Sequence, residues 1–297
     1  MTHTSLGEFL RARRAQVDPH EVGLTWVGGR RRVAGLRREE LAQLAGVSVS
    51  YYTRLEQGQS VNASDAVLDA IARALGLDDH EQQHLRTLAQ ARPARPSRPV
   101  TERVDPLTRD LLDSLSDLPA LVVGLRLDVL AWNPLAHALL AGHLDPHAVN
   151  RPAERPNLAR MLFLDGHTRD LYVDWQRKAR AVVGNLRLVA GRHPDDPALA
   201  ALIGELSMKS PQFVTLWRDH RVKPCEADSY HLQHPAVGPL TVTQHNLVVA
   251  RATGQSVCIV TTAPRSPSAD TLGLLAGTVA SLQTSSTVCR DDFNKML

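Results

Sequence analysis

The stretch of residues 37–58 carries two short helical patterns on either side of a tight turn. Apolar residues recur at helical spacing up to Gly46, a residue type that adopts a left-handed backbone at the least cost. Ser48 follows as a natural N-cap for a second helix, whose apolar positions are Tyr52 and Leu55. This layout is typical of a DNA-reading helix-turn-helix, in which the second helix enters the major groove, although it also fits an ordinary helical hairpin.

The bulk properties of the chain limit its compartment and its size. Its 297 residues allow about two domains of ordinary size, and no apolar run approaches the ~20 residues that span a bilayer. The first ten residues lack the apolar segment of a signal peptide. Cys225, Cys258 and Cys289 lie far apart and form neither a disulfide framework nor a zinc spacing. We therefore expect a cytoplasmic protein that does not enter the membrane.

Arginines gather directly ahead of the helix-turn-helix pattern. The formal net charge is only +3, yet residues 28–38 hold five arginines and no acid. A solvated loop would explain such a run, and so would an arm that contacts phosphates or the minor groove. We predict the DNA-binding residues to be Arg30, Arg31, Arg32, Arg37, Arg38, Ser48, Val49, Ser50, Tyr51, Thr53 and Arg54.

The predicted contacts differ in what they do. Arg37 and Arg38 suit phosphate oxygens, or else pair with a neighbouring glutamate on the surface. Arg54 suits a bidentate contact with guanine, which is worth about 1–3 kcal/mol of discrimination; its alternative is an ion pair within the protein. Glu56 is better explained as a structural partner of an arginine than as a base reader, and Tyr52 as a core residue.

A proline-rich segment divides the chain. We predict an all-α helix-turn-helix domain of about five helices over residues 1–91, a linker over 92–106, a second domain over 107–285 and a tail over 286–297. Strand patterns occur at 120–132 and 228–263, with helices between them, including one long helix at 168–190 and a closing helix at 268–282. The second domain is therefore expected to be α/β (α+β), around a mostly antiparallel sheet.

The second domain holds most of the few aromatic residues. They could line an apolar ligand pocket, although such residues at helical spacing also serve as core. A pocket needs a few polar groups to orient its ligand, and an acyl chain would need one cationic or hydrogen-bonding end. The predicted ligand-binding residues are Trp132, Asn133, Phe163, Tyr172, Trp175, Arg177, Phe213, Trp217 and His234.

Catalytic and metal-binding signatures are weak in this sequence. There is no glycine-rich phosphate loop, no nucleophile elbow and no paired-carboxylate pattern. His231 and His234 are three apart in a predicted strand, so they point to opposite faces. We predict no enzyme activity, no catalytic or metal-ligating residue and no cofactor. A metal or redox switch that uses Cys225 with nearby histidines such as His231 and His245 stays as an alternative.

Two runs of residues, GRRRVAGLRREELA at 29–42 and YYTRLEQG at 51–58, closely resemble MmyB-like transcription regulators, which are bacterial proteins of the XRE class of helix-turn-helix proteins. The second half resembles the same family at residues 131–133, 162–164, 171–175, 191–196, 204–207, 213–217 and 234–238. The resemblance implies a PAS-like C-terminal ligand-binding domain and a fatty-acid type of ligand. Residues 222–254 match the family least.

We therefore expect a transcription regulator that binds a two-fold site on double-stranded DNA as a homodimer and senses a small apolar, fatty-acid-like molecule. Two alternatives remain from other functional classes. One is a constitutive DNA-binding protein whose second domain only dimerises or binds a protein partner. The other is an enzyme, or a metal or redox switch, with a DNA-binding head.

Overall fold

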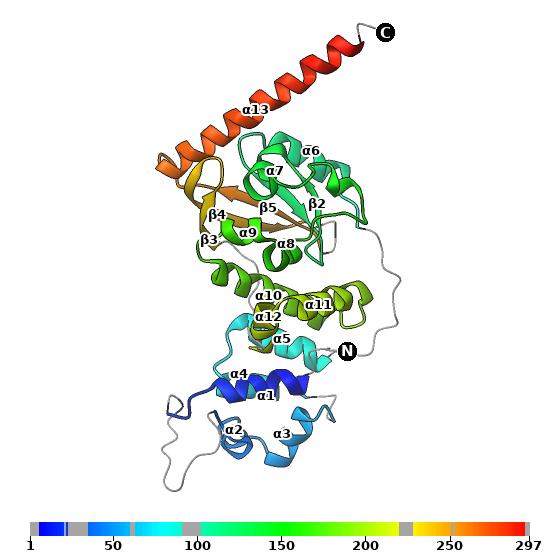
Figure 1. Ribbon diagram of the computed structural model, residues 1–297. Coiled ribbons are helices and arrows are strands. Elements are labelled where there is room, and N and C mark those ends of the chain that lie inside the picture. Colours follow the sequence, from blue (N-terminus) through cyan, green and yellow to red (C-terminus); the bar gives the residue numbers. More distant parts are fainter. Residues whose placement is uncertain are drawn as a thin grey trace. The chain divides into compact units, whose positions relative to one another are not determined.

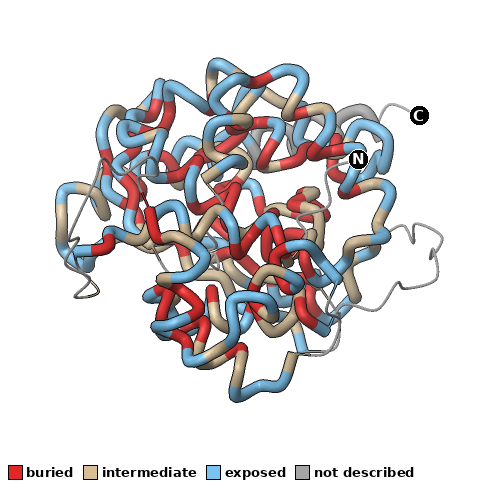
Figure 2. Tube along the Cα trace, turned by 90° about the horizontal axis from the view of Figure 1, so that it is seen from below, coloured by how far each residue is buried: buried red, intermediate tan, exposed pale blue. Residues whose placement is uncertain are grey.

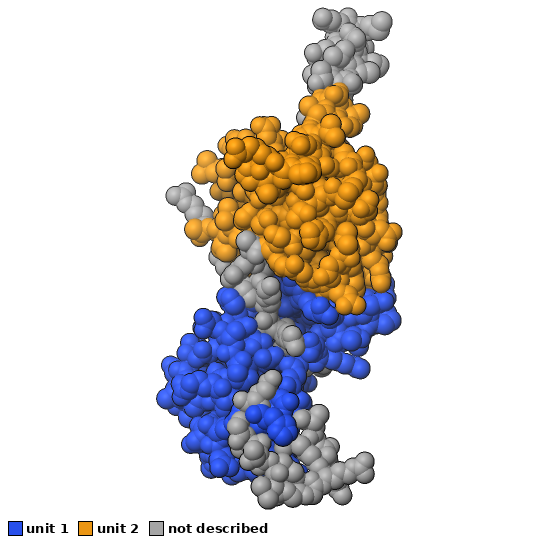
Figure 3. Space-filling model, turned by 90° about the vertical axis from the view of Figure 1, so that its left-hand side faces the viewer, with its two compact units in different colours: residues 1–99, 180–224 blue, residues 100–179, 225–297 orange. Residues whose placement is uncertain are grey.

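The computed structural model describes residues 6–20, 22, 35–59, 63–90, 102–219, 228–250, 252 and 254–294. The chain forms two compact units (Figure 3): residues 1–99 with 180–224 make unit 1, and residues 100–179 with 225–297 make unit 2. The boundary at 179/180 falls inside one continuous helix, α10 (Trp175–Arg192). One helix therefore belongs to both units.

Among the described residues of unit 1, every secondary-structure element is a helix. Its elements are α1 (Leu6–Gln16), α2 (Arg38–Leu44), α3 (Val49–Glu56), α4 (Asp65–Ala74), α5 (Asp79–Gln90), the second half of α10, α11 (Pro197–Lys209) and α12 (Pro211–Arg218). The first five of these helices confirm the predicted all-α N-terminal domain.

The turn between α2 and α3 has the local chemistry that the sequence predicts. Gly46 has a φ of 66°, in the left-handed region where a Cβ would be strained. The backbone N–H of Val47 donates to the carbonyl of Ala42 at 2.9 Å, which closes the end of α2. The hydroxyl of Ser48 accepts a hydrogen bond from the N–H of Tyr51 at 3.1 Å and caps α3. These bonds fix the helix-turn-helix.

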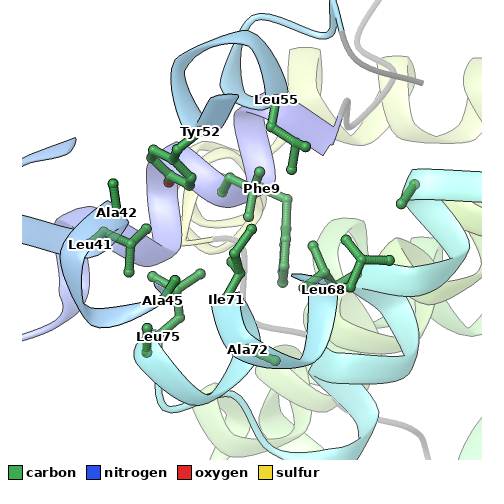
Figure 4. Close-up of a cluster of buried hydrophobic side chains, with 14 of the residues drawn as sticks. Phe9, Leu41, Ala42, Ala45, Tyr52, Leu55, Leu68, Ile71, Ala72 and Leu75 are labelled. Atoms are coloured by element: carbon green, nitrogen blue, oxygen red, sulfur yellow. The ribbon is translucent and has the colours of Figure 1, made fainter. Parts of the chain in front are cut away.

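The apolar faces of the five N-terminal helices meet in one core, part of which is shown in Figure 4. Phe9 of α1 and Tyr52 and Leu55 of α3 are fully buried there, which confirms Tyr52 as a core residue. Leu188 of α10 belongs to the same core. The C-terminal half of α10 is thus packed with the helix-turn-helix domain, although it lies about a hundred residues further along the chain.

Unit 2 is built around a sheet (Figure 1). Its described strands are β1 (Ala120–Val123), β2 (Val129–Trp132), β3 (Asp228–His234), β4 (Gly238–Val248) and β5 (Ser256–Thr261). They pair in the order β2-β1-β5-β4-β3, and every pair is antiparallel. The helices are α6 (Pro106–Ser114), α7 (Pro134–Ala141), the short 3-10 turn η1 (Ala148–Asn150), α8 (Leu158–Leu164), α9 (Gly166–Leu171), the start of α10, and α13 (Pro267–Asn294). The α+β prediction is confirmed.

The sheet has one buried face along β3 and β4. Tyr230, Leu232 and His234 are buried and alternate with the exposed Ser229 and His231, as a half-covered antiparallel sheet requires. Figure 2 shows where buried, intermediate and exposed residues lie along the described trace. The prediction that His231 and His234 point to opposite faces is therefore confirmed.

The prediction of a single helix at 168–190 is wrong. The chain forms α9 and α10 instead, with a break at residues 172–174. There Tyr172 makes an isolated β-bridge with Leu232, and the N–H of Val173 donates to the carbonyl of His231 at 3.0 Å. Pairing with a distant strand overrides the local helical pattern.

One smaller expectation also changes, and one helix begins without a side-chain cap. The closing helix, predicted to end at 282, continues as α13 to Asn294 and takes in most of the predicted tail. Ser64 stands at the N-cap position of α4, but its side chain makes no capping hydrogen bond. No helix among the described residues is long and apolar enough to cross a membrane.

Candidate DNA-reading helix and ligand site

The predicted base-reading residues lie on the outer side of α3. Ser48, Val49, Ser50 and Arg54 are exposed. Tyr51 and Thr53, the other two predicted contacts on this helix, are half-buried. Tyr52 and Leu55 anchor the opposite side of α3 in the core, so the exposed residues lie on the outer side of the helix. The structure thus brings these six predicted residues together on one helix.

The arginines predicted to contact phosphates differ in how far they are exposed. Arg37 is half-buried ahead of α2, and its backbone N–H donates to Glu40 Oε2 at 2.7 Å. Arg38 is exposed but donates from Nε to Glu56 Oε2 at 2.6 Å. Its guanidinium therefore takes part in an ion pair within the protein. Arg30, Arg31 and Arg32 lie outside the described residues.

Glu56 forms the centre of a buried ion cluster in unit 1. Its carboxylate accepts from Arg14 Nε at 2.7 Å as well as from Arg38, and Arg14 Nη1 also donates to the carbonyl of Leu36 at 2.6 Å. Burial opposes the charge of Glu56, but the two guanidinium groups overcome this and hold its carboxyl pKa below the usual range. Burial and the neighbouring Glu56 together raise the pKa of the Tyr52 hydroxyl. Glu56 thus joins α1, α2 and α3, as its predicted structural role requires.

The predicted aromatic lining does not form one group. Phe163 and Trp175 make an edge-to-face pair at 5.5 Å in unit 2, while Phe213 and Trp217 stack at 5.5 Å in unit 1. Trp132 is on the edge strand β2, and its Nε1 donates to the carbonyl of Pro146 at 2.9 Å. Tyr172 bridges to β3, at the opposite edge of the sheet, and makes an edge-to-face pair with Tyr230 at 5.7 Å.

The three predicted polar ligand groups all have partners within the chain. The Asn133 amide oxygen accepts from the N–H groups of Ala120 and Ala136, and its NH2 donates to the carbonyls of Leu115 and Leu118. A side-chain amide has no further hydrogen to donate in that state. Arg177 is exposed and pairs with Asp228. His234 Nε2 lies 3.0 Å from the carbonyl oxygen of Ala138.

Sequence reasoning missed a buried lysine on α10. Lys178 is buried, and its Nζ donates to Gln244 Oε1 of β4. The ammonium lies 4.5 Å from the ring centroid of Tyr230 and 5.5 Å from that of Tyr172. Gln244 Nε2 donates to the Tyr172 hydroxyl at 3.2 Å, so one network joins helix and sheet. The signal was a lysine within the apolar stripe of α10, four residues before Val182.

A second buried cation lies further along the same helix, in unit 1. The Arg187 side chain is fully buried, with its guanidinium carbon 4.8 Å from the Trp217 ring centroid and Nη2 donating to the Trp217 carbonyl. Burial lowers the Arg187 pKa to about 10, while Asp219 acts in the opposite direction. This residue fixes α10 to α12. Gln16 of α1 donates to the Asp219 carbonyl at 2.6 Å, which ties α12 to the N-terminal helices.

Histidines cluster beside α9. His143 Nε2 lies 2.8 Å from Asp165 Oδ2, and the His143 and His167 ring centroids are 4.0 Å apart. Burial, followed by the charge of His143, lowers the pKa of His167. Within the part of the chain that the structure describes, no group of three or more His, Cys, Asp or Glu residues could hold a metal ion. Cys225, named in the alternative switch, lies outside that part; His231 and His245 hydrogen-bond to Thr241 and Thr261.

These features define a class of protein. An N-capped, outward-facing second helix in a helix-turn-helix, joined to an α+β unit, is the architecture of a DNA-binding regulator with a second domain. Residues 5–85 match the family model described as a helix-turn-helix domain. Residues 104–275, more than half of the chain, match the MmyB-like transcription regulator ligand binding domain. The chain belongs to the MmyB-like transcription regulators. A search of curated proteins gave no match.

Proposed function

We propose that this regulator is a cytoplasmic, XRE-class homodimer that reads a two-fold DNA site and changes its DNA affinity when unit 2 binds a fatty-acid-like molecule. The observation that carries the proposal is the pairing, in one chain, of an outward-facing α3 with an MmyB-like ligand-binding domain. We keep the functional division predicted from the sequence, with DNA binding in residues 1–91 and ligand binding in 107–285.

The Lys178 network supports an acidic head group on the ligand. A buried ammonium binds a carboxylate through charge-assisted hydrogen bonds, and a hydrogen bond to a charged group is worth about 1.5–3 kcal/mol. The surrounding Tyr172 and Tyr230 rings and the apolar sheet face suit the adjoining alkyl chain. We therefore place the carboxylate at Lys178 rather than at the exposed Arg177, one of the three polar ligand residues predicted from the sequence.

Helix α10 supports the link between ligand and DNA. Lys178 lies in its unit 2 part, and Leu188, in the helix-turn-helix core, lies in its unit 1 part. Both residues belong to one continuous helix, so α10 is the segment of chain through which we propose that the two units are coupled. A ligand that favours one position of α10 shifts the population of the DNA-binding unit by its differential affinity for the two states.

The test is to identify what the protein carries. Organic extraction of the purified chain, followed by mass spectrometry, should release an aliphatic carboxylic acid, and adding such acids to the stripped protein should raise its melting temperature. Recovery of no lipid, together with no thermal shift from octanoate to stearate, would contradict the acyl ligand. It would favour the constitutive regulator whose second domain binds only a protein or a second copy.

A further inference from the structure

Helix α13 is covered by its own chain only over its first turns. Leu272 and Leu275 are buried, and the helix contacts β4 and α7, with Ser268 accepting from the N–H of Thr241. Further on, Leu274 and Leu282 have 68% and 67% of their surface exposed. Figure 1 shows the later turns of α13, in red, continuing beyond the end of the sheet. The helix therefore has two faces, and its own unit uses one of them.

The composition of α13 suits contact with another uncharged surface. From residue 271 to residue 289 the sequence holds no charged side chain. An exposed helix face normally carries charges that keep it in water. The outer face of this helix instead combines Leu274 and Leu282 with Thr278, which is also exposed. An uncharged face is complementary to a copy of itself, since no like charges oppose each other across a two-fold axis.

Two glycines in α13 also favour contact with another helix. Gly273 and Gly277 stand inside the helix, where glycine costs about 1 kcal/mol relative to alanine. Neither has a positive φ, and a Cβ at either position would meet nothing within 4 Å. Backbone geometry and packing within the chain therefore give no reason for them. Glycine on a helix surface allows another helix to approach closely.

We propose that the outer face of α13 is the interface between two copies of this chain, with Leu274, Gly277 and Leu282 at its centre. The inference rests on the proposed homodimer and supplies its surface. The uncharged stretch from residue 271 to residue 289 is about 28 Å long and about 10 Å wide, so a helix pair covers roughly 280 Å² on each copy. Because that is about a third of a standard interface of about 800 Å² on each partner, the dimer dissociates on dilution.

The experiment is sedimentation velocity on the full-length chain over a dilution series, with three variants. Leu274→Glu places a charge in the interface and should weaken association about tenfold or more. Gly277→Leu should also weaken it, although leucine is the better helix former. Leu107→Glu, on α6 and 65% exposed, is the matched control and should sediment as the wild type does. Circular dichroism confirms that each variant is folded.

Each outcome decides a different point. A wild-type dimer that Leu274→Glu and Gly277→Leu leave intact overturns the α13 interface but leaves the homodimer in place. A Gly277→Leu variant that is more heat-stable and equally associated has the same meaning. A wild type that remains monomeric at every concentration overturns both the interface and the proposed homodimer. Dimer loss in the two α13 variants alone, with the control unchanged, supports the proposal.

Discussion

Glu56 in unit 1 and Lys178 in unit 2 are both buried charges that join a helix to its surroundings, but their partners differ in kind. Glu56 is held between two guanidinium groups, at 2.7 Å and 2.6 Å. Lys178 is held by an amide oxygen and lies over two tyrosine rings. Two arginines hold the Glu56 carboxylate in the fold, whereas the Lys178 ammonium carries a positive charge that is complementary to an acidic ligand. The difference separates a residue that holds the fold from one that we assign to ligand binding.

The largest effect is expected at Glu56. Glu56→Gln removes the charge that holds Arg14 and Arg38, which leaves two guanidinium groups without their acid. Breaking a buried ion pair costs about 3–5 kcal/mol, so the free energy of unfolding of unit 1 should fall by this order. Urea denaturation followed by circular dichroism measures it. Glu39→Gln, on the exposed side of α2, is the control and should change stability little.

The pH dependence gives a second measurement on the same cluster. Because the folded-state pKa of Glu56 is lowered, its contribution is present above the unfolded pKa of about 4.3 and is lost as pH falls through the folded value. The wild-type chain should therefore lose stability on acidification, and Glu56→Gln should lose less over that interval. Equal pH slopes for wild type and variant would show that the cluster is not the joint described above.

Lys178 should contribute more to ligand binding than to the stability of the fold. Lys178→Met keeps the length and apolar stem but removes the ammonium, so the thermal shift produced by sodium laurate should disappear. The loss corresponds to about 1.5–3 kcal/mol of binding. Arg177→Met is the adjacent control and should keep the shift, since its guanidinium is exposed and paired with Asp228. The reverse pattern would place the head group at Arg177, one of the three polar ligand residues that the sequence predicts.

Two arginines of the helix-turn-helix domain are expected to have different roles, one as a base contact and the other as a phosphate contact. Arg54→Ala should weaken binding mainly at one base pair of the site, by about 1–3 kcal/mol. Arg37→Ala should weaken binding uniformly across sequences and reduce the salt slope by about one. Selection of DNA sites from a random pool, followed by anisotropy titrations at several salt concentrations, separates the two. A uniform loss for Arg54→Ala would make that residue a phosphate contact.

The smallest effect concerns the helix caps. Ser48→Ala removes the hydrogen bond to Tyr51 N–H and should cost about 1 kcal/mol of stability. Ser64→Ala changes the same residue type at the same cap position of α4, where the side chain makes no capping bond, and should cost almost nothing. Thermal denaturation of the two variants compares them directly. Equal losses would mean that both serines act through helix propensity alone.

The sequence predicts the parts of the fold whose causes are local. The turn at Gly46 and the cap at Ser48 each depend on residues a few positions apart. The break between α9 and α10 was not predictable in this way. It arises because Tyr172 pairs with Leu232, sixty residues further along the chain, and no local pattern carries that information.

The candidate site shows the same limit. Residue type marked Asn133 and His234 as ligand groups, but only the folded chain shows that backbone groups already occupy their hydrogen-bonding atoms. Lys178 was missed because its partners Gln244 and Tyr230 come from strands more than fifty residues away. Polar residues can be selected from sequence, but the bonds that engage them are set by tertiary contacts.

One chain should both read a DNA sequence and respond to a ligand in unit 2. Fluorescence anisotropy of a selected DNA site with the full-length protein, in the presence and absence of sodium laurate, measures both properties for wild type and Lys178→Met. We expect sequence-specific binding whose Kd shifts with laurate in the wild type and stays constant in the variant. A wild-type Kd that laurate leaves unchanged, or an equal shift in both proteins, would contradict it.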